Sequence, residues 1–228
     1  VYDSVEGVLN ENNRVALLFD GDDYLTSDNV ISGTAGRSVF SVHMREKMGN
    51  RKGTAIYTGG ALKTNGSALV YGAYPSKIGL FVWQGKYTVH YTPGKQYLFS
   101  HTCAENSDVV NSVLYLNGIE MTSAVESSMS INTVSTDAQI GGSWFDNPSK
   151  MGWNGTLQEL LVFSTDQSAV REVIESNIND YFGIYAQFEE EVPFQYSLAL
   201  LNPTLFQPST NNGNGSPAVY ITTNEAEL

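Results

Sequence analysis

Three aspartates near the start of the chain are the residues best suited to binding a metal ion. Asp20, Asp22 and Asp23 surround a glycine directly after an apolar run, and Asp28 follows a few residues later. Carboxylate oxygens are the hard ligands that Ca²⁺ prefers. Asp and Gly also favour tight turns for backbone reasons alone, and the spacing differs from that of an EF-hand loop. We therefore predict Asp20, Asp22 and Asp23 as calcium ligands, with an ordinary turn as the alternative interpretation.

A second candidate is the loop at 142–153, which is rich in aromatic and polar side chains. It contains Trp144 and Trp153, the adjacent pair Asp146 and Asn147, and a proline. Lectin sites stack aromatic rings on the apolar faces of sugars and bind the hydroxyls through Asp, Asn and backbone groups. We predict that the ligand-binding residues are Trp144, Asp146, Asn147 and Trp153. The alternative is that both tryptophans are core residues at strand ends.

Catalytic chemistry has less support in the sequence. A glycosidase needs two carboxyl groups close together, which on one strand would lie two or four residues apart. Glu120 and Glu126 instead flank a predicted turn, and Glu159 stands alone in its strand. The histidines lie in separate predicted strands without metal-binding spacing: His43, His90 and His101. We therefore predict a protein that is not an enzyme. The alternative is a carbohydrate-active hydrolase or lyase whose carboxylates come together only on folding.

Charge narrows the range of partners. The 228 residues include 12 Lys and Arg against 24 Asp and Glu, a formal net charge of −12. This acidity disfavours binding to nucleic-acid phosphates and to anionic membrane surfaces. No apolar run approaches the roughly 20 residues that span a bilayer. We predict no nucleic-acid partner and no membrane insertion. The acidity is also uneven, because residues 172–228 hold eight acidic residues and no basic one.

The elements that would position these residues are mostly strands. Short β-branched and aromatic runs alternate with Gly, Asn, Asp and Ser clusters, as in β-sandwiches. The runs lie at 15–19, 39–44, 54–57, 68–71, 78–83, 87–91, 96–102, 109–116, 138–140 and 157–163. Hairpin turns are expected at Asn117-Gly118, where both residues tolerate positive φ, and at Gln84-Gly85. The single Cys103 cannot form an intrachain disulfide and is expected to be buried.

One helix is predicted near the end of the sandwich. Apolar residues recur at three-to-four spacing from Asp166 to Phe182, with a capping box from Ser164 to Gln167 and Gly183 as the C-cap. Beyond it, prolines and an Asn/Gly-rich stretch are typical of a linker. We therefore predict a folded domain at 1–185 and an acidic extension at 186–228.

Four separated segments resemble one family. They are Leu17-Leu18-Phe19-Asp20-Gly21-Asp22-Asp23-Tyr24-Leu25, Tyr115-Leu116-Asn117-Gly118, Ile140-Gly141-Gly142 followed by Trp153-Asn154-Gly155-Thr156-Leu157-Gln158-Glu159-Leu160, and the helix that closes in Tyr181-Phe182-Gly183-Ile184. In order and spacing they resemble laminin-G-like domains of the concanavalin A-like lectin/glucanase superfamily, over roughly residues 14–185. The resemblance implies an all-β jelly-roll sandwich of two antiparallel sheets with one short C-terminal helix. It also implies that calcium, where bound, lies at the sandwich rim.

The resemblance and the acidic extension together indicate a function. Members with a terminal helix and no disulfides occur in bacterial surface proteins and in phage fibres, tails and head decorations. The predicted function is thus a non-catalytic recognition or assembly module, a lectin or adhesion domain at the virion surface or otherwise extracellular. Its partners would be a glycan or protein receptor, neighbouring virion subunits through the extension, or further copies of itself.

Overall fold

The computed structural model describes most of the sandwich. The described residues are 6–9, 12–28, 30–46, 54–59, 69–74, 77–82, 85–90, 92–122, 124–127, 130–133, 137–142 and 152–186. Backbone contacts divide the chain into two units, Val1–Gln187 and Phe188–Leu228. Every described residue belongs to the first unit, and the predicted extension lies outside the described residues from residue 187 onward.

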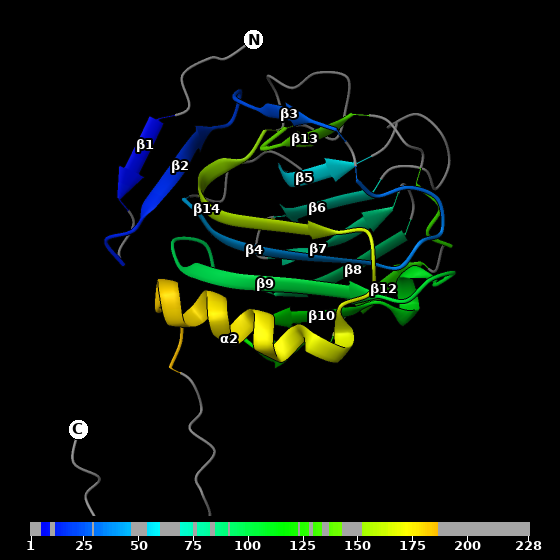
Figure 1. Ribbon diagram of the computed structural model, residues 1–228. Helices are drawn as coiled ribbons and strands as arrows, with labels where there is room; N and C mark the ends of the chain where they lie inside the picture. The colour runs from blue at the N-terminus through cyan, green and yellow to red at the C-terminus, as the bar shows by residue number, and fades with distance from the viewer. Residues whose placement is uncertain are drawn as a thin grey trace, which may run out of the picture. The chain divides into compact units, whose positions relative to one another are not determined.

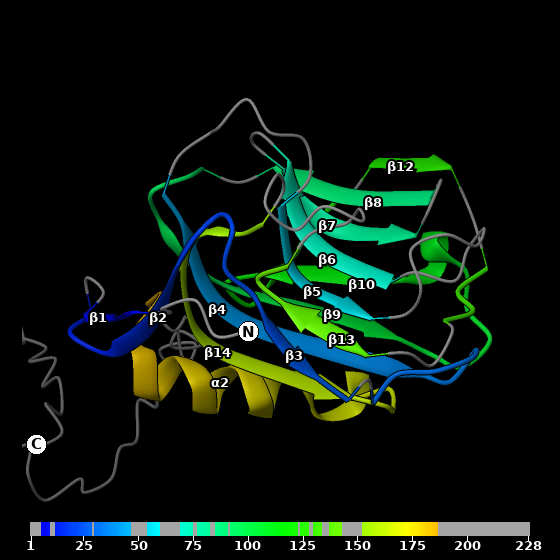
Figure 2. The ribbon, with the colours of Figure 1, turned by 90° about the horizontal axis from the view of Figure 1, so that it is seen from above.

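Two antiparallel sheets, each of seven strands within the described residues, form the fold (Figures 1 and 2). The first sheet runs in the order β1 (Glu6–Leu9), β2 (Val15–Asp20), β14 (Asn154–Phe163), β4 (Arg37–Arg45), β9 (Gln96–Cys103), β10 (Val113–Leu116) and β11 (Ile119–Glu120). The second runs in the order β12 (Ala124–Ser127), β8 (Gly85–His90), β7 (Lys77–Val82), β6 (Leu69–Tyr74), β5 (Thr54–Gly59), β13 (Ala138–Ile140) and β3 (Leu25–Ser27). This is the predicted jelly-roll sandwich.

The main core lies between the sheets. Inward side chains of both sheets, such as Phe19, Phe99, Ile56 and Leu80, are at most 1% exposed. Burying a side chain of this size contributes about 1.5–3 kcal/mol, so the opposed faces supply most of the driving force for folding. Cys103 is buried in this core, as predicted.

The helix α2 (Arg171–Phe182) covers the outer face of the first sheet and creates a second core (Figure 1). Ile178 and Phe182 pack there against Phe40, Val42 and Leu98. Strands β4 and β9 are thus covered on both faces, which explains why nearly all of their residues are buried. No described helix is long and apolar enough to cross a membrane.

Buried polar contacts fix α2 to the sheet. Glu175 accepts a hydrogen bond from the Ser100 hydroxyl and pairs with the Arg171 guanidinium. That guanidinium stacks on the Tyr115 ring, 3.8 Å from its centroid. Burial raises the pKa of Glu175, against the opposing effects of Ser100 and Arg171. These contacts set the position of the helix along β9 and β10.

The predicted turn at Asn117-Gly118 and the predicted end of the helix are confirmed. Asn117 and Gly118 have positive φ and join β10 to β11. Strands β7 and β8 pair antiparallel, but Gly85 already belongs to β8, where it pairs with Val82, and Gln84 lies outside the described residues. Gly183 ends α2 in the left-handed conformation, with φ of 62°.

Other sequence predictions were wrong in detail. The helix was expected from Asp166, but the α-helix begins at Arg171 after a 3₁₀ turn at Ser168–Val170. The expected capping box does not form, because the Gln167 amide donates to Thr165 instead. The run 109–116 is also not one strand, because a 3₁₀ turn at Val109–Asn111 precedes β10.

Candidate functional site

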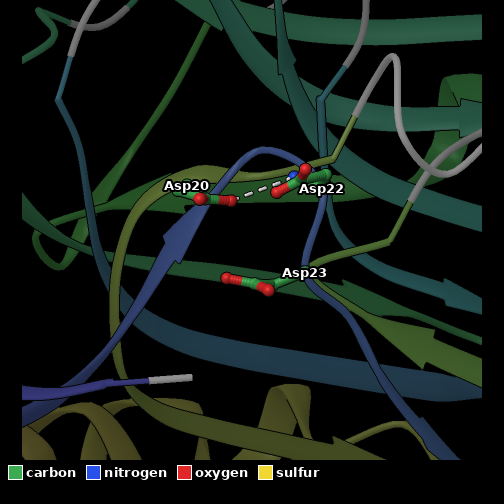
Figure 3. Close-up of side chains that lie close together, drawn as sticks. All are labelled: Asp20, Asp22 and Asp23. Atoms are coloured by element: carbon green, nitrogen blue, oxygen red, sulfur yellow. Dashed lines mark hydrogen bonds between the residues drawn. The ribbon is translucent and has the colours of Figure 1, made fainter. Parts of the chain in front are cut away.

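The three aspartates predicted as metal ligands lie together at the end of β2 (Figure 3). One carboxylate oxygen from each of Asp20, Asp22 and Asp23 lies within 4.8 Å of the others. Asp20 and Asp22 are exposed, whereas Asp23 is 8% exposed. The backbone N–H of Asp22 donates to Asp20 Oδ1 at 3.2 Å, and Gly21 between them has φ of 108°, a conformation that favours glycine.

The two exposed carboxyl groups influence each other's protonation. Hydrogen bonds from the side chain and backbone of Asp22 lower the pKa of Asp20. The pKa of Asp22 is raised, first by its hydrogen bond to Asp20 and then by repulsion from the Asp20 carboxylate. Two carboxylates this close repel each other, and a divalent cation bound between them would relieve that repulsion. The donor set, three hard carboxylate oxygens at the rim, fits Ca²⁺ better than a transition metal.

Neighbouring strands hold the aspartate loop in place. The N–H of Gly152 donates to the Gly21 carbonyl at 3.1 Å, and Asn154 Nδ2 donates to the Asp20 carbonyl at 2.8 Å. A Cβ atom on Gly152 would lie 2.5 Å from the Gly21 oxygen, so only glycine permits this close approach. These two hydrogen bonds join the aspartate loop to the start of β14 and to the residue Gly152 just before it. They fix the backbone that carries the three carboxylates.

The predicted sugar-binding loop starts and ends at the same rim. Gly141 closes β13 and accepts a hydrogen bond at 2.8 Å from the N–H of Trp153, next to the contact between Gly152 and Gly21. The residues between these ends, 143–151, lie outside the described residues, and so do Trp144, Asp146 and Asn147. What the structure does bring together is the aspartate loop and both ends of the predicted binding loop.

Trp153 lies in the core and not on a binding surface. It is 1% exposed, and its ring meets that of His43 edge to face with centroids 5.4 Å apart. Its indole N–H has no hydrogen-bond partner among the described residues. The side chain therefore fills the space behind the rim, as the alternative interpretation had it.

The buried histidines are unsuited to act as bases near neutral pH. His43 in β4 and His101 in β9 are completely buried, and desolvation lowers the pKa of each to about 3. Both side chains are neutral at physiological pH and contribute to packing between the sheets.

Comparison with known proteins identifies the fold. No protein-family model and no curated protein matches the sequence. Among solved structures, domain 4 of the extracellular arabinanase AbnA from Geobacillus stearothermophilus is similar with a TM-score of 0.54 at 15% identity, covering 79% of this chain and 82% of that one. The binding domain of botulinum neurotoxin serotype G gives 0.54 at 12% identity, covering 76% and 45%.

A third similar structure is a sialidase from Trypanosoma rangeli, with a TM-score of 0.51 at 11% identity, covering 72% of this chain and 28% of that one. Identities this low show a shared β-sandwich jelly roll and nothing finer.

Proposed function

We propose that this chain is a non-catalytic carbohydrate-binding module that holds its glycan at the rim formed by Asp20–Asp23 and the loop after β13. One observation supports the proposal: the loop of Asp20, Asp22 and Asp23 lies beside Gly141 and Gly152, which flank the segment predicted to bind sugar. Loops on a rigid β-sandwich are a common place for binding residues. Domain 4 of the arabinanase, which shares the fold, was solved in complex with arabinotriose.

Each residue has a proposed part in binding. Asp20, Asp22 and Asp23 would hold Ca²⁺, whose remaining coordination positions are filled by backbone carbonyls, water or sugar hydroxyls. Trp144 would stack on an apolar sugar face, and Asp146 and Asn147 would bind hydroxyl groups. The buried Trp153 is left out of this set because its side chain is not presented to solvent.

The setting we propose is extracellular or on the surface of a virion, where such a module would work in adhesion. It follows from the laminin-G-like motifs and from the acidic, lysine- and arginine-free segment after Arg171. In that setting the extension would dock on neighbouring subunits or on another copy of the chain.

Calcium binding is tested by thermal denaturation. For a dissociation constant of about 1 mM, typical of extracellular modules, 10 mM CaCl₂ stabilises the folded state by about 1.4 kcal/mol. In a domain of this size the melting temperature should rise by about 3–6 °C and fall again with chelator. The Asp22→Asn variant should show no calcium-dependent rise in melting temperature. The control variant Asp137→Asn, at the exposed residue just before β13, should show the same rise as the wild type. An unchanged melting temperature together with no heat in a calcium titration would overturn the metal site.

Glycan binding is tested on a glycan array followed by calorimetry of the strongest hits. Trp144→Ala should lower affinity about five- to thirtyfold, because a stacked ring contributes about 1–2 kcal/mol. Tyr24→Ala, a substitution of another aromatic residue near the rim, serves as the matched control. An array without signal, or hits that bind the Trp144→Ala variant unchanged, would contradict the proposed function.

One observation favours a second candidate, a carbohydrate-active hydrolase. A sialidase from Trypanosoma rangeli, solved with sialic acid, shares the fold over 28% of its chain, and Asp20 and Asp22 are two neighbouring exposed carboxyl groups of this chain. Incubation with a panel of glycans and analysis of the products tests it. Hydrolysis that Asp22→Asn abolishes would establish the enzyme, and intact glycans that remain bound would establish the binding module.

A further inference from the structure

A second surface feature lies at the far end of β2, where the turn between β1 and β2 meets the C-terminus of α2. Asn13 has φ of 57°, and Asn12 Oδ1 accepts the N–H of Arg14 at 3.1 Å. Asn12 Nδ2 donates to the carbonyl of Phe182, the last helical residue, at 2.8 Å. The turn is thus fastened to the end of the helix, and this fixes the backbone from which Arg14 extends.

The Arg14 side chain is held in two ways. Its Nε donates to the Tyr181 carbonyl at 3.2 Å, and its guanidinium carbon lies 4.3 Å from the centroid of the Tyr181 ring. Both side chains are exposed, Tyr181 by 57%. Among the described residues, Nη1 and Nη2 of Arg14 have no hydrogen-bond partner. The N–H groups of Nη1 and Nη2 are therefore available to an outside acceptor, while the contacts of Nε and of the ring with Tyr181 orient the guanidinium plane.

Capping of the helix C-terminus explains only part of this arrangement. A cation near the last carbonyls is favourable, but the cap uses the single N–H of Nε. The other arginines with described contacts use their outer nitrogens. Those of Arg37 donate to Gly33, Ala35 and Thr133, and those of Arg171 donate to Glu172 and Glu175. Arg14 differs because its fork faces solvent beside an exposed aromatic ring.

We propose that Arg14 and Tyr181 form a binding site for a sugar that carries a carboxylate. A planar carboxylate accepts two parallel N–H bonds from a guanidinium fork, and stacking holds that fork ready. The exposed part of the Tyr181 ring and its hydroxyl offer the apolar contact and the polar end that a sugar ring requires. Because the side chains are fixed before binding, little entropy is lost in ordering them.

This site is separate from the aspartate rim. Arg14 immediately precedes β2 and Asp20 ends it, so the two residues are six steps apart along an extended strand, about 20 Å at 3.3–3.4 Å per residue. The inference shares with the proposed function only the sugar nature of the ligand, and it needs neither calcium nor Trp144.

The test is an NMR titration of the full chain with three small probes. Methyl β-glucuronide has both groups, methyl β-glucoside has the sugar ring alone, and acetate has the carboxylate alone. We expect saturable shifts of the Arg14 and Tyr181 resonances with the glucuronide, at an affinity at least tenfold above that of either other probe. If acetate or the glucoside binds as tightly as the glucuronide, the site does not recognise an acidic sugar and the proposal is wrong.

Variants locate the interaction. Arg14→Gln should weaken glucuronide binding at least tenfold, and Arg14→Lys at least threefold, because lysine keeps the charge but lacks the fork. Lys95→Gln removes a charge from another exposed cation and should change the affinity less than twofold. Equal losses in the Arg14→Gln and Lys95→Gln variants would reduce the effect to net charge and refute the site.

Two further controls keep the result interpretable. Thermal denaturation of each variant checks that the helix cap survives, and Tyr181→Phe should retain binding within threefold where Tyr181→Ala loses at least fivefold. Asp22→Asn should leave glucuronide binding at Arg14 unchanged. If it abolishes that binding, the ligand occupies the aspartate rim and the Arg14 site is wrong, while the proposed function stands.

Discussion

The contacts beneath α2 lead to a specific prediction about Glu175. Its side chain is 3% exposed and pairs with Arg171, which is itself only 9% exposed. Replacement by alanine leaves the Arg171 guanidinium without its buried partner and the Ser100 hydroxyl without its acceptor. Removing one partner from a buried ion pair costs about 3–5 kcal/mol, so we expect Glu175→Ala to lower the free energy of unfolding by that amount.

Glutamine at the same position should behave differently. Desolvation raises the pKa of Glu175 above its ordinary value of 4.5, so folding favours the protonated carboxyl. The stability that this protonated form supplies is fully present below pH 4.5 and is lost as the pH rises through the raised folded pKa. Glutamine leaves Arg171 without its buried charged partner, as alanine does, but it keeps the volume of the side chain and can still accept the hydrogen bond from the Ser100 hydroxyl. We therefore expect Glu175→Gln to cost at least about 1 kcal/mol less than Glu175→Ala at pH 7.

Urea denaturation and thermal denaturation at pH 5 and pH 7, each followed by circular dichroism, measure both effects. At about 2–4 °C per kcal/mol, the alanine variant should melt roughly 10 °C below the wild type. Glu172→Gln, which changes the exposed member of the same cluster, should cost less than about 1 kcal/mol. If the glutamine and alanine variants are equally destabilised at pH 7, the charge and not the shape of Glu175 holds the helix, and the reasoning fails.

Three further predictions concern stability. Gly155→Ala should cost about 3 kcal/mol or more in urea denaturation, because φ is +147° and a Cβ atom would overlap the backbone of β4. Asn12→Ala should cost about 1 kcal/mol, since the carbonyl of Phe182 then loses its donor. His43 and His101, with pKa values lowered to about 3, should make stability fall as the pH drops below 6.5, by up to about 2.7 kcal/mol per unit for the two together. Unfolding curves at pH 7, 5 and 4 measure this, and a variant with glutamine at both positions should have a flatter dependence.

The strands that could be predicted are those with strong local patterns. The run at 39–44 became β4 because its β-branched and aromatic residues alternate between two cores. The short strands β3 and β11 were missed, since three or two residues carry no periodic signal. Val109 looks like a strand residue in the sequence, yet it is buried at the start of a 3₁₀ turn. Burial alone therefore does not distinguish the two conformations.

The candidate sites differ in how far sequence could reveal them. Asp20, Asp22 and Asp23 are neighbours in the chain, so a tight loop suffices to bring their carboxylates together. No sequence spacing marks the stack of Arg14 on Tyr181, whose residues are 167 positions apart. Their contact depends on where the helix ends relative to the β1–β2 turn, and packing on the first sheet decides that.

An acidic ligand is affected both by the net negative charge of the chain and by the few exposed basic side chains. Arg37, Arg45 and Arg171 are buried, so Arg14 and Lys95 are the exposed cations among the basic side chains whose burial is described. The net charge of −12 repels anions at long range, although the Arg14 guanidinium attracts a carboxylate at contact distance. Salt screens the repulsion beyond about 8 Å at physiological ionic strength but acts less on a direct contact. We therefore expect the affinity of Arg14 for glucuronide to stay constant or rise as NaCl increases from about 20 to about 150 mM. A falling affinity would instead indicate attraction to a broadly basic surface and would contradict binding at Arg14 alone.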